Sequence, residues 1–166
     1  MSPSALTIRF TRTSPTRHRV EFLRADGTRE EADLETRSLL LHDFVHFAIE
    51  TEGRIRDGFY GRIARGIRAA DLAHPQQIPG RDDELMATER VVGPLQTAWR
   101  RGANPDAFVA KVRDHLESVG AAVPTWLEAD LVRRAMATIT RLDGQWRATP
   151  FGAAMELAFA AAPAPA

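Results

Sequence analysis

The chain has 166 residues, of which 44% are hydrophobic and 27% are charged, and its 22 basic residues balance 22 acidic ones. This length fits one domain, and the apolar fraction is too high for wholesale disorder. The absence of cysteine excludes disulfide scaffolds, thiolate metal sites and cysteine nucleophiles. The zero formal net charge removes the simplest argument for nucleic-acid binding, so no nucleic-acid partner is expected.

Signals for export or membrane insertion are lacking. The first four residues, 1–4, have neither the charged start nor the apolar core of a signal peptide. No run of about 18 uninterrupted apolar residues occurs, as a membrane-spanning helix would require. We therefore expect a cytoplasmic protein with no membrane partner. Its expected partner is an unknown small molecule or protein, and an oligomer is possible.

The first third of the chain has the alternation of β-strands. Residues 5–12 alternate between apolar and polar side chains, and Val20 and Phe22 continue this pattern in a second strand. The Asp-Gly pair at 26–27 is a hairpin signal, because both residue types tolerate positive φ. A third and more polar strand is expected at about 28–34, at the edge of the sheet.

Helical periodicity begins at about residue 36. The segment from there to Gly53 carries apolar residues on all sides, which predicts a buried helix. A short amphipathic helix is expected at about 60–71, followed by a Pro- and Gly-rich connector at 74–81. Three further helices are predicted at about 82–100 with a kink or break at Gly93-Pro94, from Asn104 to Gly120, and from a capping box at 125–128 to about 139.

The C-terminal region is ambiguous. The Asp-Gly pair at 143–144 predicts a second hairpin turn. Beyond it, Met155, Leu157 and Phe159 alternate as in a strand, although Phe151, Met155 and Phe159 fit a helix equally well. We expect a strand, because it could pair with the N-terminal sheet.

The predicted elements define an α+β fold. A small antiparallel sheet of N-terminal strands, with the C-terminal strand as a further candidate, packs against four or five helices. Residues 1–160 are expected to form a single domain, and 161–166 a disordered Ala/Pro tail.

Two histidines on the first predicted helix suggest chemistry. His42 and His46 are four residues apart, which places them about 40° apart on one helix face. Neutral imidazoles so placed can share one divalent ion. In a buried helix each unsatisfied ring would cost about 1–3 kcal/mol, so something must satisfy both. Either a metal does so, or backbone carbonyls, Asp43, Glu50 or a buried water do.

A catalytic zinc needs three protein ligands and an open position. Glu50 lies too far along the helix from His42 to share an ion with it, so we expect Glu50 to orient the His46 ring. Glu89 is the preferred third ligand, because a carboxylate on the inward stripe of its helix needs a partner. The alternative places Glu89 on the surface beside Arg90. Weaker candidates for the third ligand are Glu84, His74, Asp57 and His115.

Two known metal motifs resemble this helix. The pattern His42-Asp43-x-x-His46 resembles the zincin metalloprotease motif with Asp in place of Glu, which implies that Asp43 acts as general base. The same residues resemble the His-Asp core of HD-domain phosphohydrolases. That resemblance implies an all-helical fold, an upstream metal-ligating His, for which only His18 is present, and a later Asp such as Asp130.

A third resemblance is longer. The pattern His42-Asp43-x-x-His46-x-x-x-Glu50, followed by the Gly-Phe-Tyr-Gly segment 58–61, is similar to a group of bacterial proteins with no established activity. It covers about 36–66 and implies a fold with N-terminal strands, this helix and a C-terminal strand.

The sequence thus supports two main hypotheses. The first is a metal-dependent hydrolase in which His42, His46 and Glu89 hold a divalent ion, zinc by preference, and Asp43 and Glu50 are catalytic. The second is a non-catalytic interaction or accessory module in which both histidines are structural. A third hypothesis is ligand binding by aromatic residues, among which Tyr60 is expected to reach solvent or a site. The other aromatic candidates are Phe59, Trp99, Trp126 and Trp146.

Overall fold

The structure, a computed structural model, describes residues 5–72 and 83–164. Its four strands are β1 (Ala5–Arg12), β2 (Arg17–Arg24), β3 (Arg29–Glu35) and β4 (Ala154–Ala160). They form one antiparallel sheet in the order β3-β2-β1-β4. The predicted α+β fold is confirmed, and the C-terminal segment is a strand that pairs with β1.

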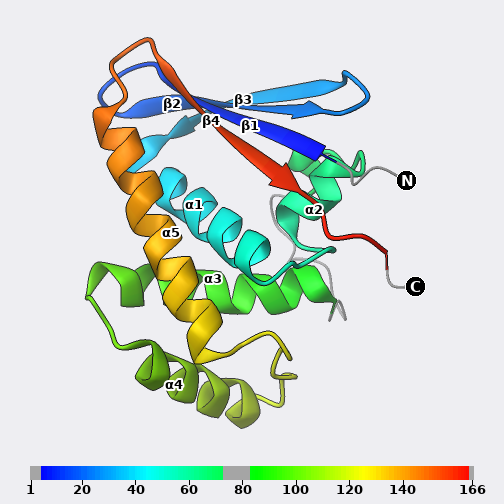
Figure 1. Cartoon of the computed structure of the whole chain (residues 1–166), viewed down its shortest axis with the longest axis vertical. Helices are drawn as coiled ribbons and strands as arrows, with labels where there is room; N and C mark the ends of the chain where they lie inside the picture. Colours follow the sequence, from blue (N-terminus) through cyan, green and yellow to red (C-terminus); the bar gives the residue numbers. More distant parts are fainter. Residues whose placement is uncertain (1–4, 73–82, 165–166) are drawn as a thin grey trace.

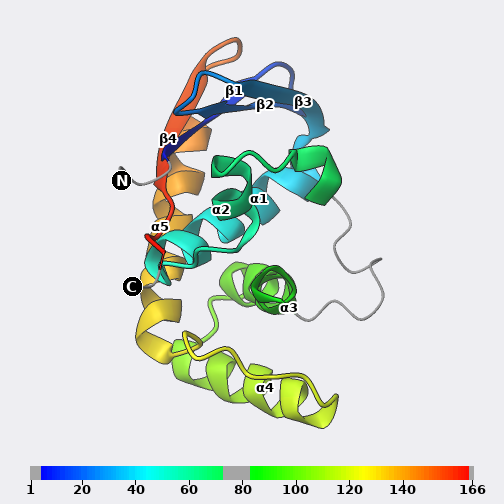
Figure 2. The same cartoon turned by 90° about the vertical axis from the view of Figure 1, so that its right-hand side faces the viewer.

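The helices lie on one side of this sheet (Figures 1 and 2). Their bounds are α1 Thr36–Glu52, α2 Phe59–Ala64, α3 Glu84–Arg100, α4 Pro105–Ser118 and α5 Ala129–Ala148, and a short 3-10 turn, η1, covers Ala69–Leu72. Helix α1 runs beneath the sheet, and α4 lies at the end of the molecule farthest from it (Figure 1). Within the described ranges, none of the helices combines the length and apolarity needed to cross a bilayer.

Helix α1 separates two hydrophobic clusters. Its Phe44 and Phe47 pack with the inward side chains of the sheet, whereas its Val45, Ala48 and Ile49 pack with α3, α4 and α5. This position explains why apolar residues surround the helix, because it is buried on opposite faces. Polar side chains on α1 are therefore held in a largely dry environment.

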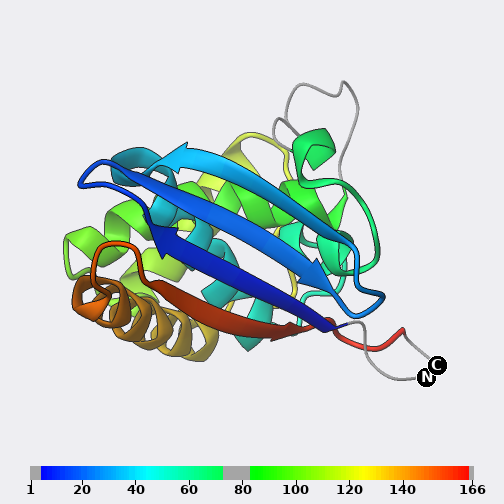
Figure 3. The same cartoon turned by 90° about the horizontal axis from the view of Figure 1, so that it is seen from above.

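Figure 3 shows the other face of the sheet from above. This face carries charged side chains. Arg9 on β1 donates from Nε to Glu156 on β4 at 2.7 Å and lies 3.6 Å from Glu21 on β2. Arg19 pairs with Asp33 across the next strand pair at 3.2 Å. Alternation along the strands therefore separates an apolar inner face from a charged outer one.

Several predicted boundaries are wrong. The 143–144 pair lies inside α5, because Leu142 and Trp146 are buried on its inward stripe and Asp143 pairs with Arg147 one turn later. Helix α5 begins at Ala129, and no side chain at 125–128 caps it, so the predicted capping box does not form.

Two other helices also differ from expectation. The helix predicted at 60–71 is two elements, α2 and η1, interrupted at Gly66, whose φ is +100°. Helix α3 continues through Pro94, which is exposed, rather than splitting there. The predicted connector at 74–81 lies outside the described residues. Ala161, which the sequence assigned to the tail, is buried in the core beside the sheet.

His18 on β2 is a polar group inside the apolar layer. Its ring lies 6.0 Å from those of Phe10 and Trp146, and its Nδ1 lies 3.1 Å from Thr36 Oγ1. No described residue bonds its Nε2. Burial, partly opposed by Glu35, lowers the pKa of His18 to about 4.

This depressed pKa makes the fold sensitive to acid. Because the unfolded ring binds a proton near pH 6.5 and the folded ring near pH 4, stability is expected to fall as pH decreases through that interval. The slope from this group approaches about 1.4 kcal/mol per pH unit. Urea unfolding of the wild type and of His18→Leu at pH 7 and pH 5 measures this pH dependence of the free energy of unfolding.

The substitution His18→Leu should remove this part of the pH dependence, whereas His115→Gln, on the exposed face of α4, should not. A difference between wild type and His18→Leu that stays constant from pH 7 to pH 5 would show that His18 is not the acid-sensitive group.

Candidate metal centre

The candidate centre lies where α1 faces α3. His42 and His46 stand one turn apart on α1, with ring centroids 4.9 Å apart. Glu89 reaches them from α3, with Oε1 2.9 Å from His46 Nε2 and Oε2 3.7 Å from His42 Nε2. The structure thus brings together the three residues that the sequence proposed as metal ligands, and Glu89 is on the inward side of α3.

One side of this group is open to solvent. The His46 side chain is 2% exposed, whereas His42 is 34% and Glu89 20% exposed. A buried histidine therefore anchors the group, and two partly exposed ligands border it. Parts of the His42 and Glu89 side chains are therefore accessible to water.

Glu50 is almost fully buried, and its carboxylate gathers four contacts. The backbone N–H groups of Phe59, Tyr60 and Gly61 donate to it over 2.8, 2.9 and 3.3 Å. His46 Nδ1 lies 3.2 Å from its Oε1. Glu50 therefore holds both the start of α2 and the orientation of the His46 ring.

Two glycines make room for this contact. A Cβ at Gly58 would lie 2.5 Å from Glu50 Cδ, and a Cβ at Gly61 would lie 1.9 Å from the backbone oxygen of Arg56. The Gly-Phe-Tyr-Gly segment is the tightly packed start of helix α2. Gly58 allows the main chain to approach the buried Glu50 carboxylate, and Gly61 allows it to approach the Arg56 backbone.

The charges of the group are strongly perturbed. For His46, burial alone favours the neutral ring, but Glu50 and Glu89 outweigh it and raise the pKa to about 10. Burial, together with His46, lowers the pKa of His42 despite Glu89. Burial raises the pKa of Glu89, yet His46 and His42 together hold it below its usual value.

The three side chains could hold a metal ion. Each offers one ligand atom, and these atoms lie within 4.8 Å of one another. Zinc takes nitrogen and oxygen ligands at about 2.0–2.2 Å, so small side-chain rotations would bring all three onto one ion. Two histidines and one glutamate are also a common ligand set of catalytic zinc.

Asp43 lies beside this group and borders a cavity. The cavity has a volume of about 440 Å³ between the β2-β3 edge of the sheet and the α2-η1 segment, and Phe59 also lines it. The Phe59 ring lies 5.3 Å from that of His46. Burial, and secondarily Glu89, raises the pKa of Asp43 to about 7, against the opposing effect of His46.

Tyr60 does not reach solvent, so that expectation is wrong. Its side chain is 0% exposed, and its hydroxyl donates to the backbone oxygen of Asp43 at 3.1 Å. It contacts the rings of Phe22, Phe47 and Phe159, and it does not line either of the two cavities beside α1. Its place is in the core, where it braces α2 against α1.

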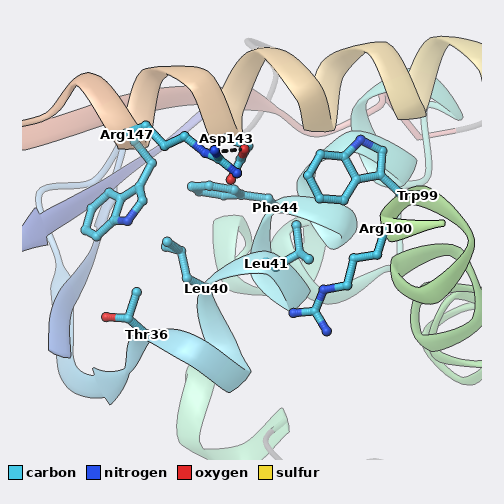
Figure 4. A pocket seen from close by; sticks show the side chains of 9 residues that line it. Thr36, Leu40, Leu41, Phe44, Trp99, Arg100, Asp143 and Arg147 are labelled. Carbon is cyan, nitrogen blue, oxygen red and sulfur yellow. Dashed lines mark ion pairs between the residues drawn. The ribbon is translucent and has the colours of Figure 1, made fainter. Parts of the chain in front are cut away.

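A second hollow lies beside α1, against α3 and α5 (Figure 4). Its volume is about 590 Å³, and Trp99 and Trp146 line it. The Asp143–Arg147 pair, at 2.8 Å, lies along its α5 wall (Figure 4). The aromatic residues that the sequence grouped into one ligand pocket are therefore divided, since Phe59 lines a different cavity and Tyr60 neither.

The weaker ligand candidates lie elsewhere. Glu84 accepts from the Asp57 backbone N–H at 2.7 Å, and the Asp57 carboxylate pairs with Arg65. His115 is exposed on α4, and His74 lies outside the described residues. The α+β fold also differs from the all-helical fold implied by the HD-domain resemblance. The HD-domain resemblance also suggested His18 and Asp130 as metal ligands. These residues belong to β2 and α5 and are not part of the group formed by His42, His46 and Glu89.

Some contacts were not foreseen from the sequence. Gln96, seven residues after Glu89 on α3, acts with Glu89 to oppose the lowering of the His42 pKa by burial and His46. Arg24 on β2 donates to the backbone oxygens of Ile63 and Ile67 at 2.6 and 3.1 Å and also pairs with Glu30. These bonds fix the α2-η1 segment over the cavity. These hydrogen bonds of Arg24 could not be predicted from the sequence, because their acceptors are main-chain atoms far away along the chain.

The chain was compared with protein-family models, with curated proteins and with solved structures, and no match was found in any of the three. The interpretation of the site therefore depends on its geometry alone.

The role of Glu50 can be tested by removing its charge. The substitution Glu50→Gln should destabilise the fold by about 2–4 kcal/mol, because an amide accepts fewer of the buried N–H bonds and loses its ionic contact with His46. The matched change Glu52→Gln, on the same helix, affects partly exposed contacts with Arg134 and Thr138 and should cost under about 1 kcal/mol. Urea denaturation gives both values, and equal losses would contradict the proposed anchoring role.

The close approach at Gly61 gives a second test. Gly61→Ala should destabilise by at least about 2 kcal/mol, because its Cβ would overlap the Arg56 backbone oxygen. Gly93→Ala, in α3 with nothing within 4 Å of its Cβ, should instead stabilise by about 0.5–1 kcal/mol. Thermal unfolding of the two variants checks the opposite signs. A Gly61→Ala protein as stable as wild type would mean that α2 does not start in this way.

Proposed function

We propose that this protein is a divalent-metal-dependent hydrolase, with zinc as its metal and His42, His46 and Glu89 as the ligands. The observation that carries the proposal is the convergence of these three side chains from two helices, with one side exposed. A structural metal site is usually closed by four protein ligands, whereas a catalytic site keeps a position open. Three ligands beside solvent favour the catalytic type.

The neighbouring side chains support this proposal. A bound zinc ion supplies Lewis-acid activation of water. Glu50 fixes the orientation of the His46 ring through its contact with Nδ1. Asp43, whose pKa of about 7 lies near neutrality, is suited to accept and return a proton next to the site.

The cavity beside Asp43 is the proposed place for the substrate. Val20, Phe22 and Phe59 give it apolar walls. Its charged lining residues besides Asp43 are Glu30, Glu31 and Arg68. The substrate is therefore a small molecule with an apolar part and a hydrolysable bond near Asp43. The expected location of the protein is the cytoplasm.

A second candidate rests on a specific observation. Both nitrogens of His46 contact a carboxylate, so a protonated ring would be satisfied without any metal. In that case the cluster is a buried ion-pair network, and the protein is a non-catalytic interaction or accessory module. The two candidates differ in whether the site binds a divalent ion.

Metal analysis of protein purified without an affinity tag decides between them. We expect close to one equivalent of zinc per chain after incubation and dialysis, and a rise in melting temperature on adding zinc. The variants His42→Gln, His46→Gln and Glu89→Gln should each weaken zinc binding at least about tenfold, whereas His115→Gln should not. The zinc-loaded protein should hydrolyse members of a panel of p-nitrophenyl esters and phosphate esters, and chelation should abolish this activity.

The metal-binding measurement and the activity measurement can each contradict the proposal. Absence of zinc, manganese and nickel binding, with loss of stability in the His46→Gln variant, would remove the hydrolase proposal and favour the accessory module. Stoichiometric zinc binding without turnover of any panel member would retain the metal centre and reject these ester classes as substrates.

A further inference from the structure

We infer that the groove between α3 and α4 is a binding site for a small amphipathic anion, a molecule with a short apolar chain that ends in a carboxylate. The groove has a volume of about 400 Å³, which lies in the range of small-molecule sites. It is separate from the candidate metal centre, because none of His42, His46 and Glu89 lines it and its α3 residues lie about 80° or more around the helix from Glu89. The inference therefore does not depend on the proposed hydrolase.

The titratable side chains that line the groove, among the described residues, are all basic. Arg90, Arg101, Lys111 and His115 line it, and no acidic residue is among the described residues that do so. The whole chain, by contrast, has as many acidic as basic residues. Within the described parts of the chain no carboxylate pairs with Arg101 or Lys111, so both cations are available to an anionic group. Lys111 is also the single lysine of the chain.

The floor of the groove is apolar. Ala98 from α3 and Phe108 and Val112 from α4 are buried beneath it, and Ala107 borders it at the start of α4. A bare inorganic anion would leave this floor unused. An apolar chain would cover this floor, and the removal of its apolar surface from water favours binding.

The position of the groove suits a ligand from solution. Helix α4 lies at the end of the molecule away from the sheet (Figures 1 and 2). The cationic side chains of Arg101 and Lys111 are exposed, whereas the apolar floor residues are buried. A ligand can therefore insert its chain between the helices and leave its carboxylate at the rim, where cations and solvent meet.

Titration of the protein with decanoate below its micelle concentration tests the inference, with calorimetry for affinity and amide chemical shifts for location. We expect saturable one-to-one binding and shifts centred on Thr97, Ala107 and Val112. Decanol, which has the chain without the charge, and acetate, which has the charge without the chain, should each bind at least about tenfold more weakly.

Variants of exposed residues keep the test independent of folding. Arg101→Gln combined with Lys111→Gln should weaken decanoate binding at least about tenfold, and Ala107→Trp should block it. Ala110→Trp, on the same helix and outside the groove, should bind as wild type. Far-ultraviolet circular dichroism confirms that each variant is folded.

The inference would be overturned by equal affinity for decanol and decanoate, by a lack of saturable decanoate binding, or by unchanged decanoate binding in the Ala107→Trp variant. Binding of an acidic amphipathic peptide in place of decanoate would also overturn it, and would identify the groove as a protein-docking surface instead.

Discussion

The carboxylate of Glu50 connects the scaffold to the candidate site. It lies inside the molecule, where an ionised group without partners would be very costly, and it is satisfied by three main-chain N–H groups and by His46. The start of α2, the course of the chain through Gly58 and the position of the His46 ring all depend on this one group. Other contacts of the site, including that of Glu89 with His46, follow from where the ring is held.

The location of α1 explains why such a network exists. The helix is buried against the sheet on one face and against helices on the other, so each polar side chain on it needs a partner from a neighbouring element. Glu89 from α3 supplies such a partner to His46, and the main chain of α2 supplies partners to Glu50. A metal ion at His42, His46 and Glu89 would replace a proton in a network whose geometry the fold already determines.

Much of this arrangement follows from sequence periodicity. Alternation identified the strands, including β4, and all-round apolarity identified α1 as buried. The one-turn spacing of His42 and His46 and the inward stripe of α3 pointed to a shared centre with Glu89. These inferences succeed because spacing along a regular element determines which face a residue occupies.

Two inferences failed because distant parts of the chain decide the local structure. The Asp-Gly pair at 143–144 has good turn chemistry, but the burial of Leu142 and Trp146 on one stripe keeps α5 intact. Tyr60 between glycines resembled an exposed loop residue, yet those glycines serve close packing against Glu50 and Arg56. Local sequence cannot show which distant group occupies the space that a glycine leaves.

The order of strands in the sheet has a consequence for synthesis of the chain. The strand β1 pairs on one side with β2, its immediate successor, and on the other with β4, the last strand in the chain order. While the polypeptide emerges from the ribosome, β1 therefore keeps an unpaired edge, and Ile8 and Phe10 stay uncovered by β4, until β4 has been made. A nascent chain in this condition is prone to aggregation, because open sheet edges beside apolar residues promote association between chains.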